Sequence, residues 1–223
     1  NIPVTTSIEG KSAFPENHPL SLGSGGRANA RQVKRYLAEA DVIFGVGVSF
    51  ALTAFGVPMP ANKGGAKTLI HATMDPMDLN KDVPVQHGLI GDAKLTLQTL
   101  SAAMENHPKT PAQQRAAEPE KIAAVKAEWR SEWLPKLTSN DIPINPYRVV
   151  AELDRLVDKD KVIITHDAGS PRDQTTPFWE STTPLSYIGW GKTTQLGYGL
   201  GLAMGAKLAA PEKLCINVWG DAA

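Results

Sequence analysis

Short apolar runs alternate with amphipathic stretches along most of this chain. Runs rich in β-branched or other apolar residues predict strands at residues 2–6, 41–47, 68–72, 161–165 and 214–218. Apolar residues at helical spacing predict helices at residues 28–40, 92–104, 119–137, from Pro146 onward and at 195–208. Because strands that alternate with helices form parallel sheets with right-handed crossovers, we expect an α/β fold.

Prolines and one change in composition mark the expected borders. Residues 11–26 are rich in proline, glycine and serine and are predicted to form a loop. Asp92 is expected to cap the helix that follows it. Residues 105–118 lose the apolar period, and Pro119, at a first-turn position, is expected to begin the next helix. The chain is therefore predicted to form two units, residues 1–107 and 118–223, joined by a linker at 108–117.

Charge and cysteine content exclude several classes of protein. The 223 residues carry 23 basic and 23 acidic side chains, a balance that argues against nucleic acid or a membrane surface as partner. No apolar run approaches the ~20 residues of a membrane span. Cys215 is the single cysteine, which excludes a disulfide framework, so we expect a reducing, cytoplasmic location.

Glycines gather near the C-terminal end, where the chemistry is expected. Six glycines lie between Gly189 and Gly205, and the strand at 214–218 ends at Gly220 and Asp221. Glycines let a backbone approach a ligand closely, and a carboxylate beside backbone N–H groups suits a Mg²⁺ ion that carries phosphates. A second strand ends at Thr165. Two strand ends flanking a glycine-rich helix predict a ligand site at one edge of a sheet.

Two sets of motifs carry a family resemblance. The C-terminal set consists of Thr194–Leu200, Gly205–Ala209 with Pro211, and Gly220–Ala222. The N-terminal set consists of Ile2–Thr6, Gly10-Lys11, Ala13–Leu20 and Leu22-Gly23. In this order they resemble the diphosphate-binding and central domains of thiamine-diphosphate enzymes of the acetolactate synthase and pyruvate oxidase group.

The resemblance implies a fold, an activity and partners. The fold would be two Rossmann-like parallel-sheet layers, both incomplete, since the chain looks like a fragment that lacks the first part of the central domain and stops after the Gly-Asp motif. The intact enzyme would use thiamine diphosphate and Mg²⁺ to form or cleave a carbon–carbon bond next to the carbonyl of a 2-oxo acid. The glutamate that activates the cofactor would come from a neighbouring subunit, which implies a homodimer or homotetramer and an inactive fragment.

The same resemblance assigns site residues. The expected cofactor contacts are Gly169, Ser170, Thr194, Gln195, Leu196, Gly197, Gly220, Asp221, Ala222 and Ala223. Asp221 would bind Mg²⁺, with a further ligand beyond Ala223. Leu196 stands where a large apolar residue supports the bent cofactor, a proximity effect on the internal base. The alternatives are a turn or helix-cap carboxylate at Asp221, an ordinary turn at Gly169 and a core leucine at Leu196.

Other interpretations of the sequence remain open. The transferase interpretation, acetolactate synthesis, competes with a 2-oxo-acid decarboxylase or 2-hydroxyacyl-CoA lyase of the same group, and with a non-catalytic nucleotide-binding module. Gly45, Gly47 and Asp75 match a dinucleotide site only weakly, and Ser49 stands where flavin-bearing relatives have an arginine, so we do not expect FAD. His166 is the only histidine near the expected site, and a surface or hydrogen-bonding role is preferred to catalysis.

Overall fold

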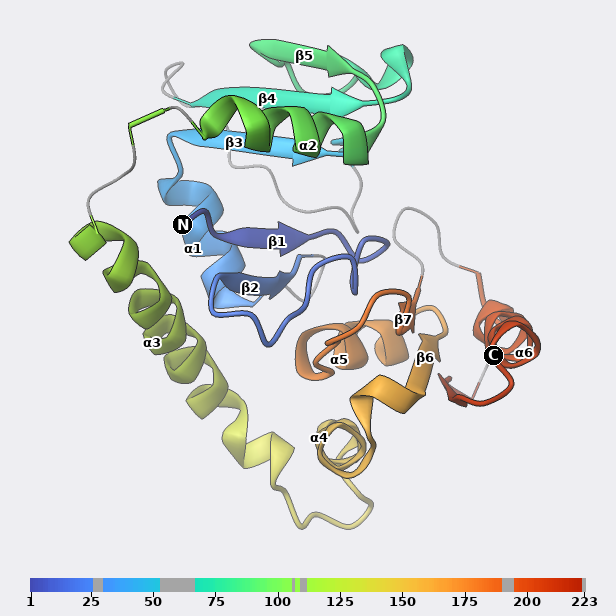
Figure 1. The fold of residues 1–223 in the computed structure, drawn as a ribbon. Coiled ribbons are helices and arrows are strands. Elements are labelled where there is room, and N and C mark those ends of the chain that lie inside the picture. The colour runs from blue at the N-terminus through green and yellow to red at the C-terminus, as the bar shows by residue number, and fades with distance from the viewer. Residues whose placement is uncertain (26–29, 53–66, 106, 109–111, 190–194, 222–223) are drawn as a thin grey trace.

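The computed structural model describes residues 1–25, 30–52, 67–105, 107–108, 112–189 and 195–221. Within them all paired strands are parallel and helices pack beside the sheets, which confirms the α/β class (Figure 1). The strands are β1 (Val4–Thr6), β2 (Ser21–Ser24), β3 (Val42–Val46), β4 (Thr68–Thr73), β5 (His87–Ile90), β6 (Val162–His166), β7 (Tyr187–Ile188) and β8 (Leu214–Val218). The helices are α1 (Arg31–Glu39), α2 (Ala93–Met104), α3 (Ala112–Leu137), α4 (Pro146–Leu156), α5 (Ser170–Phe178) and α6 (Tyr198–Ala209), with 3-10 turns at Pro76–Asp78 and Lys159–Lys161. In this order, the longest strictly alternating run of strands and α-helices extends from α4 to β8.

The strands form separate small sheets among the described residues. Their orders are β1-β2, β3-β4-β5 and β7-β6-β8. Strand β4 pairs with β3 over Val42–Val46 and with β5 over His87–Ile90. Asp92 caps α2, because its Oδ1 accepts a hydrogen bond of 3.0 Å from the Leu95 N–H, as the sequence predicted. Among all the described residues, no helix combines the length and apolarity needed to cross a membrane.

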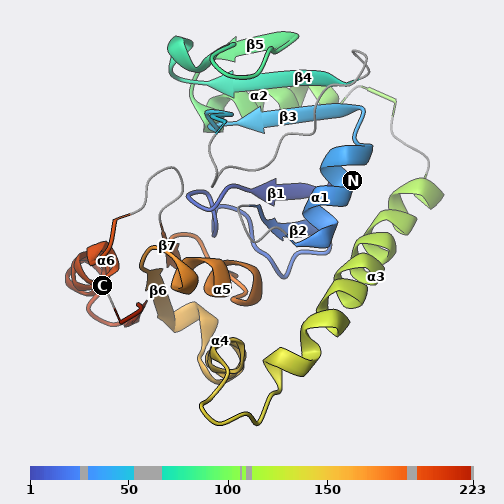
Figure 2. The same ribbon diagram turned by 180° about the vertical axis from the view of Figure 1, so that it is seen from behind.

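Helix α3 runs diagonally along one side of the molecule (Figure 2) and packs against elements of both the N-terminal and the C-terminal half. Its Ile122 is buried with Leu22 and Val33 of the N-terminal region. Farther along, Trp129 and Trp133 pack against Phe178 of α5. The helix begins at Ala112, inside the predicted linker, and Pro119 lies within it, so the prediction that Pro119 begins this helix is wrong.

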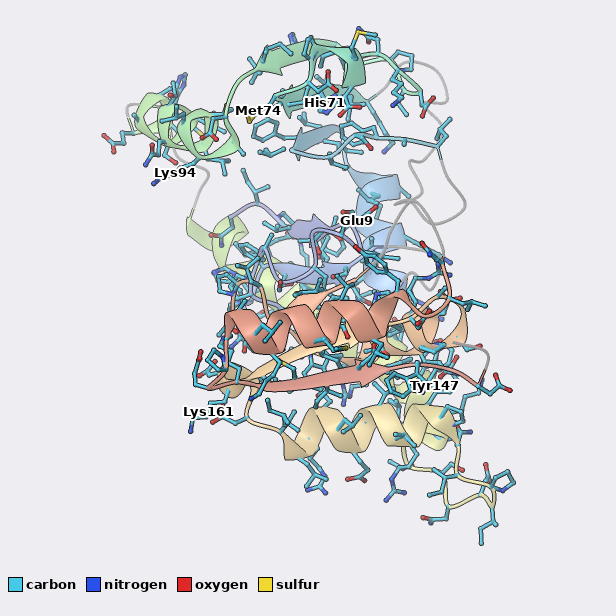
Figure 3. The ribbon with its side chains drawn as sticks, turned by 90° about the vertical axis from the view of Figure 1, so that its right-hand side faces the viewer. Glu9, His71, Met74, Lys94, Tyr147 and Lys161 are labelled. Atoms are coloured by element: carbon cyan, nitrogen blue, oxygen red, sulfur yellow. The ribbon has the colours of Figure 1, made fainter. Side chains whose placement is uncertain are left out.

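Helices cover both faces of the β7-β6-β8 sheet. Figure 3 shows α6 above the strands and α4 below them. On the α4 side, Val162 and Ile164 form a buried cluster with Trp179 and Tyr187. On the α6 side, the Thr165 hydroxyl donates to the Gly199 carbonyl oxygen at 3.0 Å. Gly199, Ala203 and Ala206 are the buried residues of α6, and these small side chains let the helix pack closely on the sheet.

Two glycines of α6 should respond in opposite ways to alanine. A Cβ at Gly199 would lie 2.4 Å from Asn217 Oδ1 and 2.8 Å from the His166 carbonyl oxygen, whereas a Cβ at Gly201 would meet nothing within 4 Å. We expect Gly199→Ala to lower the free energy of unfolding by about 1–3 kcal/mol through overpacking. Gly201→Ala should raise it by up to ~1 kcal/mol through helix propensity. Urea denaturation of the full-length protein measures both, and equal effects would contradict the close packing of Gly199.

Candidate cofactor site

The structure brings the predicted strand ends together at one edge of a sheet. Strands β6 and β8 are parallel neighbours, so their carboxyl ends lie side by side. The Asp167 N–H donates to the Val218 carbonyl oxygen at 2.9 Å, just beyond the end of β6. A Cβ at Gly220 would lie 4.0 Å from Pro171 Cγ, which places the residue before Asp221 against the start of α5.

Asp167 joins this edge to the start of α6. Its side chain is 1% exposed. Its Oδ1 accepts from the Ala168 N–H at 2.7 Å, and its Oδ2 accepts from the Gly197 N–H at 2.9 Å. No role was predicted for Asp167 from the sequence, although an aspartate before small residues at a strand end often accepts hydrogen bonds from nearby backbone N–H groups.

Two helices begin at this edge with glycine at the N-cap. Gly169 (φ 77°) precedes α5 and Gly197 (φ 83°) precedes α6. Neither helix start has a side-chain cap, and a Cβ at either glycine would meet nothing within 4 Å. Helix N-termini present backbone N–H groups and a partial positive charge, so this pair forms an anion-binding edge. Pro171 in the first turn of α5 cannot donate, which leaves fewer N–H groups there.

The other predicted site residues line the same edge. Ser170, Gln195, Leu196 and Asp221 are exposed, and Leu196 has 57% of its surface accessible. In this part of the protein, Leu196 is therefore not covered by other side chains. Among the described residues, Asp221 has no hydrogen bond or ion pair, and no three His, Cys, Asp or Glu side chains gather into a metal site. Thr194, Ala222 and Ala223 lie outside the described residues.

The backbone N–H groups at these helix starts and the exposed Asp221 carboxylate fit a magnesium-bridged diphosphate. Hard Mg²⁺ takes few protein oxygens and completes its shell with phosphate and water. Asp221 can supply one such oxygen, while Gly169 and Gly197 leave room for phosphate oxygens near the helix starts. The donor set therefore agrees with the cofactor that the sequence motifs imply.

Gly45 and Asp75, two residues of the weak match to a dinucleotide site, make contacts within the protein. A Cβ at Gly45 would lie 2.2 Å from the Phe50 ring, so a side chain already covers this glycine. The Asp75 carboxylate accepts from the Met77 N–H at 2.9 Å and caps the 3-10 turn at Pro76–Asp78. Residues 53–66 lie outside the described part of the chain.

His166 differs from its predicted setting. It is the last residue of β6 and is 0% exposed, so the surface alternative is wrong. Its Nδ1 lies 2.9 Å from the Asp167 carbonyl oxygen. This contact confirms the predicted hydrogen-bonding role of His166.

Comparisons with known proteins identify the family of the chain. Residues 1–100 match the model of the thiamine pyrophosphate enzyme central domain, and residues 167–223 match that of the C-terminal thiamine pyrophosphate binding domain. The chain is 31% identical over 228 residues to the probable acetolactate synthase large subunit of Methanococcus aeolicus, covering 99% of this chain and 38% of that protein. It is 30% identical over 222 residues to the acetolactate synthase isozyme 3 large subunit of Escherichia coli (strain K12), with the same coverage. The chain thus spans 38% of the length of these two relatives. Since models of two domains of one enzyme family match more than half of its residues in the expected order, the chain belongs to the thiamine pyrophosphate enzymes.

Proposed function

We propose that the protein is part of a thiamine-diphosphate- and Mg²⁺-dependent enzyme that forms or cleaves a carbon–carbon bond next to a carbonyl. The observation that carries the proposal is that two helix starts without side-chain caps and the exposed Asp221 carboxylate lie at the carboxyl edge of β6 and β8. The substrate would be a 2-oxo acid and the reaction acetolactate synthesis, as the names of the relatives suggest.

Each site residue has a role in this proposal. Gly169, Ser170 and Gly197 hold the diphosphate, and Asp221 holds Mg²⁺. Gln195 and Leu196 support the aminopyrimidine end, helped by the exposure of the Leu196 side chain. Thr194, Gly220, Ala222 and Ala223 complete the contacts. The bound cofactor would supply carbanion stabilisation, while the protein binds it, bends it and orients it.

An apolar stripe on α6 supports an oligomer. Leu200, Met204 and Leu208 are spaced four residues apart and are 47%, 61% and 86% exposed. Residues at this spacing share one face of a helix. We assign this face to a homo-oligomeric contact, through which a neighbouring subunit supplies the activating glutamate.

We also propose that the chain divides into two units at the linker of residues 108–117. Helix α3 contacts residues of both units.

Asp221→Ala should abolish metal-dependent cofactor binding. Loss of a side chain that only supports a metal ligand weakens metal affinity by up to ~100-fold. Because Asp221 would bind Mg²⁺ directly, its removal should weaken the affinity for thiamine diphosphate by at least that factor. Isothermal calorimetry of the full-length protein with thiamine diphosphate and Mg²⁺ measures this.

Glu212→Ala is the matched control for Asp221→Ala. Glu212 is another exposed carboxylate, but it lies before β8, at the opposite edge of the sheet. Its replacement should leave the affinity unchanged. Equal, metal-dependent binding by wild type and Asp221→Ala would contradict the proposed site, and absence of binding by wild type would favour a non-catalytic module.

A further inference from the structure

Polar side chains at the ends of β6 and β8 bind the backbone at the start of α6. The Thr165 hydroxyl donates to the Gly199 carbonyl oxygen at 3.0 Å and lies 2.9 Å from Asn217 Oδ1. Thr165 is 0% exposed, so its hydroxyl is buried beneath the helix. Asp167, just after β6, accepts from the Gly197 N–H at 2.9 Å. The sheet therefore holds the start of α6 at two backbone positions, Gly197 and Gly199.

Gly199 lets the helix backbone come this close to the sheet. A Cβ at this position would lie 2.4 Å from Asn217 Oδ1 and 2.8 Å from the His166 carbonyl oxygen. Because glycine has no such atom, the polar groups of β6 and β8 reach the peptide units of the first turn. The position of that turn thus depends on hydrogen bonds from Thr165 as well as on apolar packing.

The Thr165 hydroxyl carries a single hydrogen, yet three acceptors surround it. They are Asn217 Oδ1 and the carbonyl oxygens of Gly199 and Ile216, the last at 3.4 Å. Asn217 Nδ2 is buried and has no acceptor in the described part of the chain. A 180° turn of the amide exchanges its two atoms, so that Nδ2 donates to the Thr165 oxygen and the hydroxyl hydrogen goes to the nearer carbonyl, that of Gly199. In either orientation Asn217 bonds to Thr165 and orients its hydroxyl.

These contacts lie beneath the helix start that faces the cofactor edge. The first N–H groups of an α-helix have no intrahelical acceptor, and together they attract an anion. Gly197 leaves room for a phosphate, but its N–H is bonded to Asp167, so the donors at α6 are the N–H groups that follow it. One of them belongs to Gly199, whose carbonyl group is bonded to Thr165. A shift of Gly199 would therefore displace these donors directly.

We propose that Thr165 and Asn217 are positioning residues for the cofactor site, which hold the backbone of Gly199 where the first N–H groups of α6 meet the diphosphate of thiamine diphosphate. The inference rests on the proposed function. Thr165 is fully buried and does not touch the cofactor. It acts through Gly199, and Asn217 acts through Thr165, so the effect of both appears in cofactor affinity.

The test separates the hydroxyl of Thr165 from its shape in the full-length protein. Thr165→Val keeps the shape but loses the hydroxyl, and it should weaken thiamine diphosphate binding about 10-fold at saturating Mg²⁺, the lower end of the effect of groups that orient ligands. Thr165→Ser keeps the hydroxyl and should bind the cofactor as wild type does, although the loss of a buried methyl group lowers its thermal unfolding midpoint. Isothermal calorimetry measures the affinities.

Thr73→Val is the matched control for Thr165→Val. Thr73 is a buried threonine that ends β4, in a different sheet, and its Oγ1 accepts from the Asp75 N–H at 3.2 Å. Its replacement should lower the thermal unfolding midpoint and leave the affinity for thiamine diphosphate unchanged.

A double-mutant cycle tests whether Asn217 acts through Thr165. Asn217→Ala should weaken binding by less than Thr165→Val does. The double variant Thr165→Val/Asn217→Ala should bind no more weakly than Thr165→Val, because both residues act on Gly199 through the same hydroxyl. Additive losses would overturn the role assigned to Asn217.

Three further results would overturn the inference and leave the proposed function intact. They are wild-type affinity in Thr165→Val, an equal loss of affinity in Thr165→Ser, and an equal loss in Thr73→Val. Either of the last two would mean that affinity follows stability and not the hydroxyl. No metal-dependent binding by wild type would overturn the proposed function itself, and this inference with it.

Discussion

Lys11→Met should lower the free energy of unfolding by about 3–5 kcal/mol, the cost of removing one partner of a buried ion pair. Lys11 is 2% exposed and forms a salt bridge with Glu16, itself 7% exposed. Glu16 also accepts from Ser24 Oγ at 2.9 Å and from the Ser181 N–H at 2.9 Å. Without the ammonium, a charged carboxylate would remain buried with two neutral donors.

The ion pair connects segments that are far apart in the sequence. The Glu16 N–H donates to the Ser181 carbonyl oxygen at 2.8 Å, so the loop before β2 and the stretch before β7 are bound to each other twice. Loss of the pair should therefore loosen this contact first. Hydrogen exchange in peptides that contain Ser181, together with urea denaturation of the full-length protein, measures both the local and the global effect.

The double variant Lys11→Met/Glu16→Gln is the control for Lys11→Met. Burial lowers the pKa of Lys11 even though Glu16 opposes the shift, which means that the attraction of the pair does not fully offset the desolvation of the ammonium. Replacing both charges should thus restore most of the stability that the single variant loses. A double variant as unstable as Lys11→Met would show that packing, and not the uncompensated charge, dominates.

The strongly apolar elements were predictable from the sequence, and the short ones were not. Strand β8 occupies the predicted residues 214–218, because a run of apolar residues bounded by lysine and glycine has few alternatives. Strand β2 lies in a predicted loop, since Ser21–Ser24 contains one apolar residue and is stabilised by pairing with β1. Strand β5, strand β7 and helix α5 were missed for a related reason. Their positions depend on contacts with distant residues, which local composition does not contain.

The same distinction applies to the candidate site. Gly169, Gly197 and Asp221 could be singled out from the sequence because such a site requires particular residue types, and the structure gives both glycines a positive φ and places Asp221 after a strand. The contacts of His166 and Asp167 were not predictable, because the residues that they meet, Gly189 and Gly197, lie 23 and 30 residues away in the chain. A buried polar side chain at a strand end acquires its role only when the fold brings its partners to it.

Asp167→Ala should lower the free energy of unfolding by about 3–5 kcal/mol. The substitution removes two hydrogen bonds to a charged acceptor, each worth about 1.5–3 kcal/mol, and leaves the N–H groups of Ala168 and Gly197 without that partner. Asp167→Asn should cost about half as much, because its amide oxygen can still accept one of the two bonds. Urea denaturation measures the stability, and calorimetry measures the accompanying loss of thiamine diphosphate affinity.

A double-mutant cycle between Asp167 and Gly197 would separate the contributions of the two Asp167 hydrogen bonds to stability. Gly197 has φ 83°, a left-handed conformation that costs alanine about 1–2 kcal/mol. If Asp167 holds Gly197 in this conformation, the backbone can relax once Asp167 is alanine, and Gly197→Ala should then lower the free energy of unfolding by less. The losses in the two single variants should therefore sum to more than the loss in the double variant. Strict additivity would mean that Asp167 stabilises only its own turn at Ala168. The start of α6, and the anion-binding edge that depends on it, would then be set by the packing of α6 on the sheet.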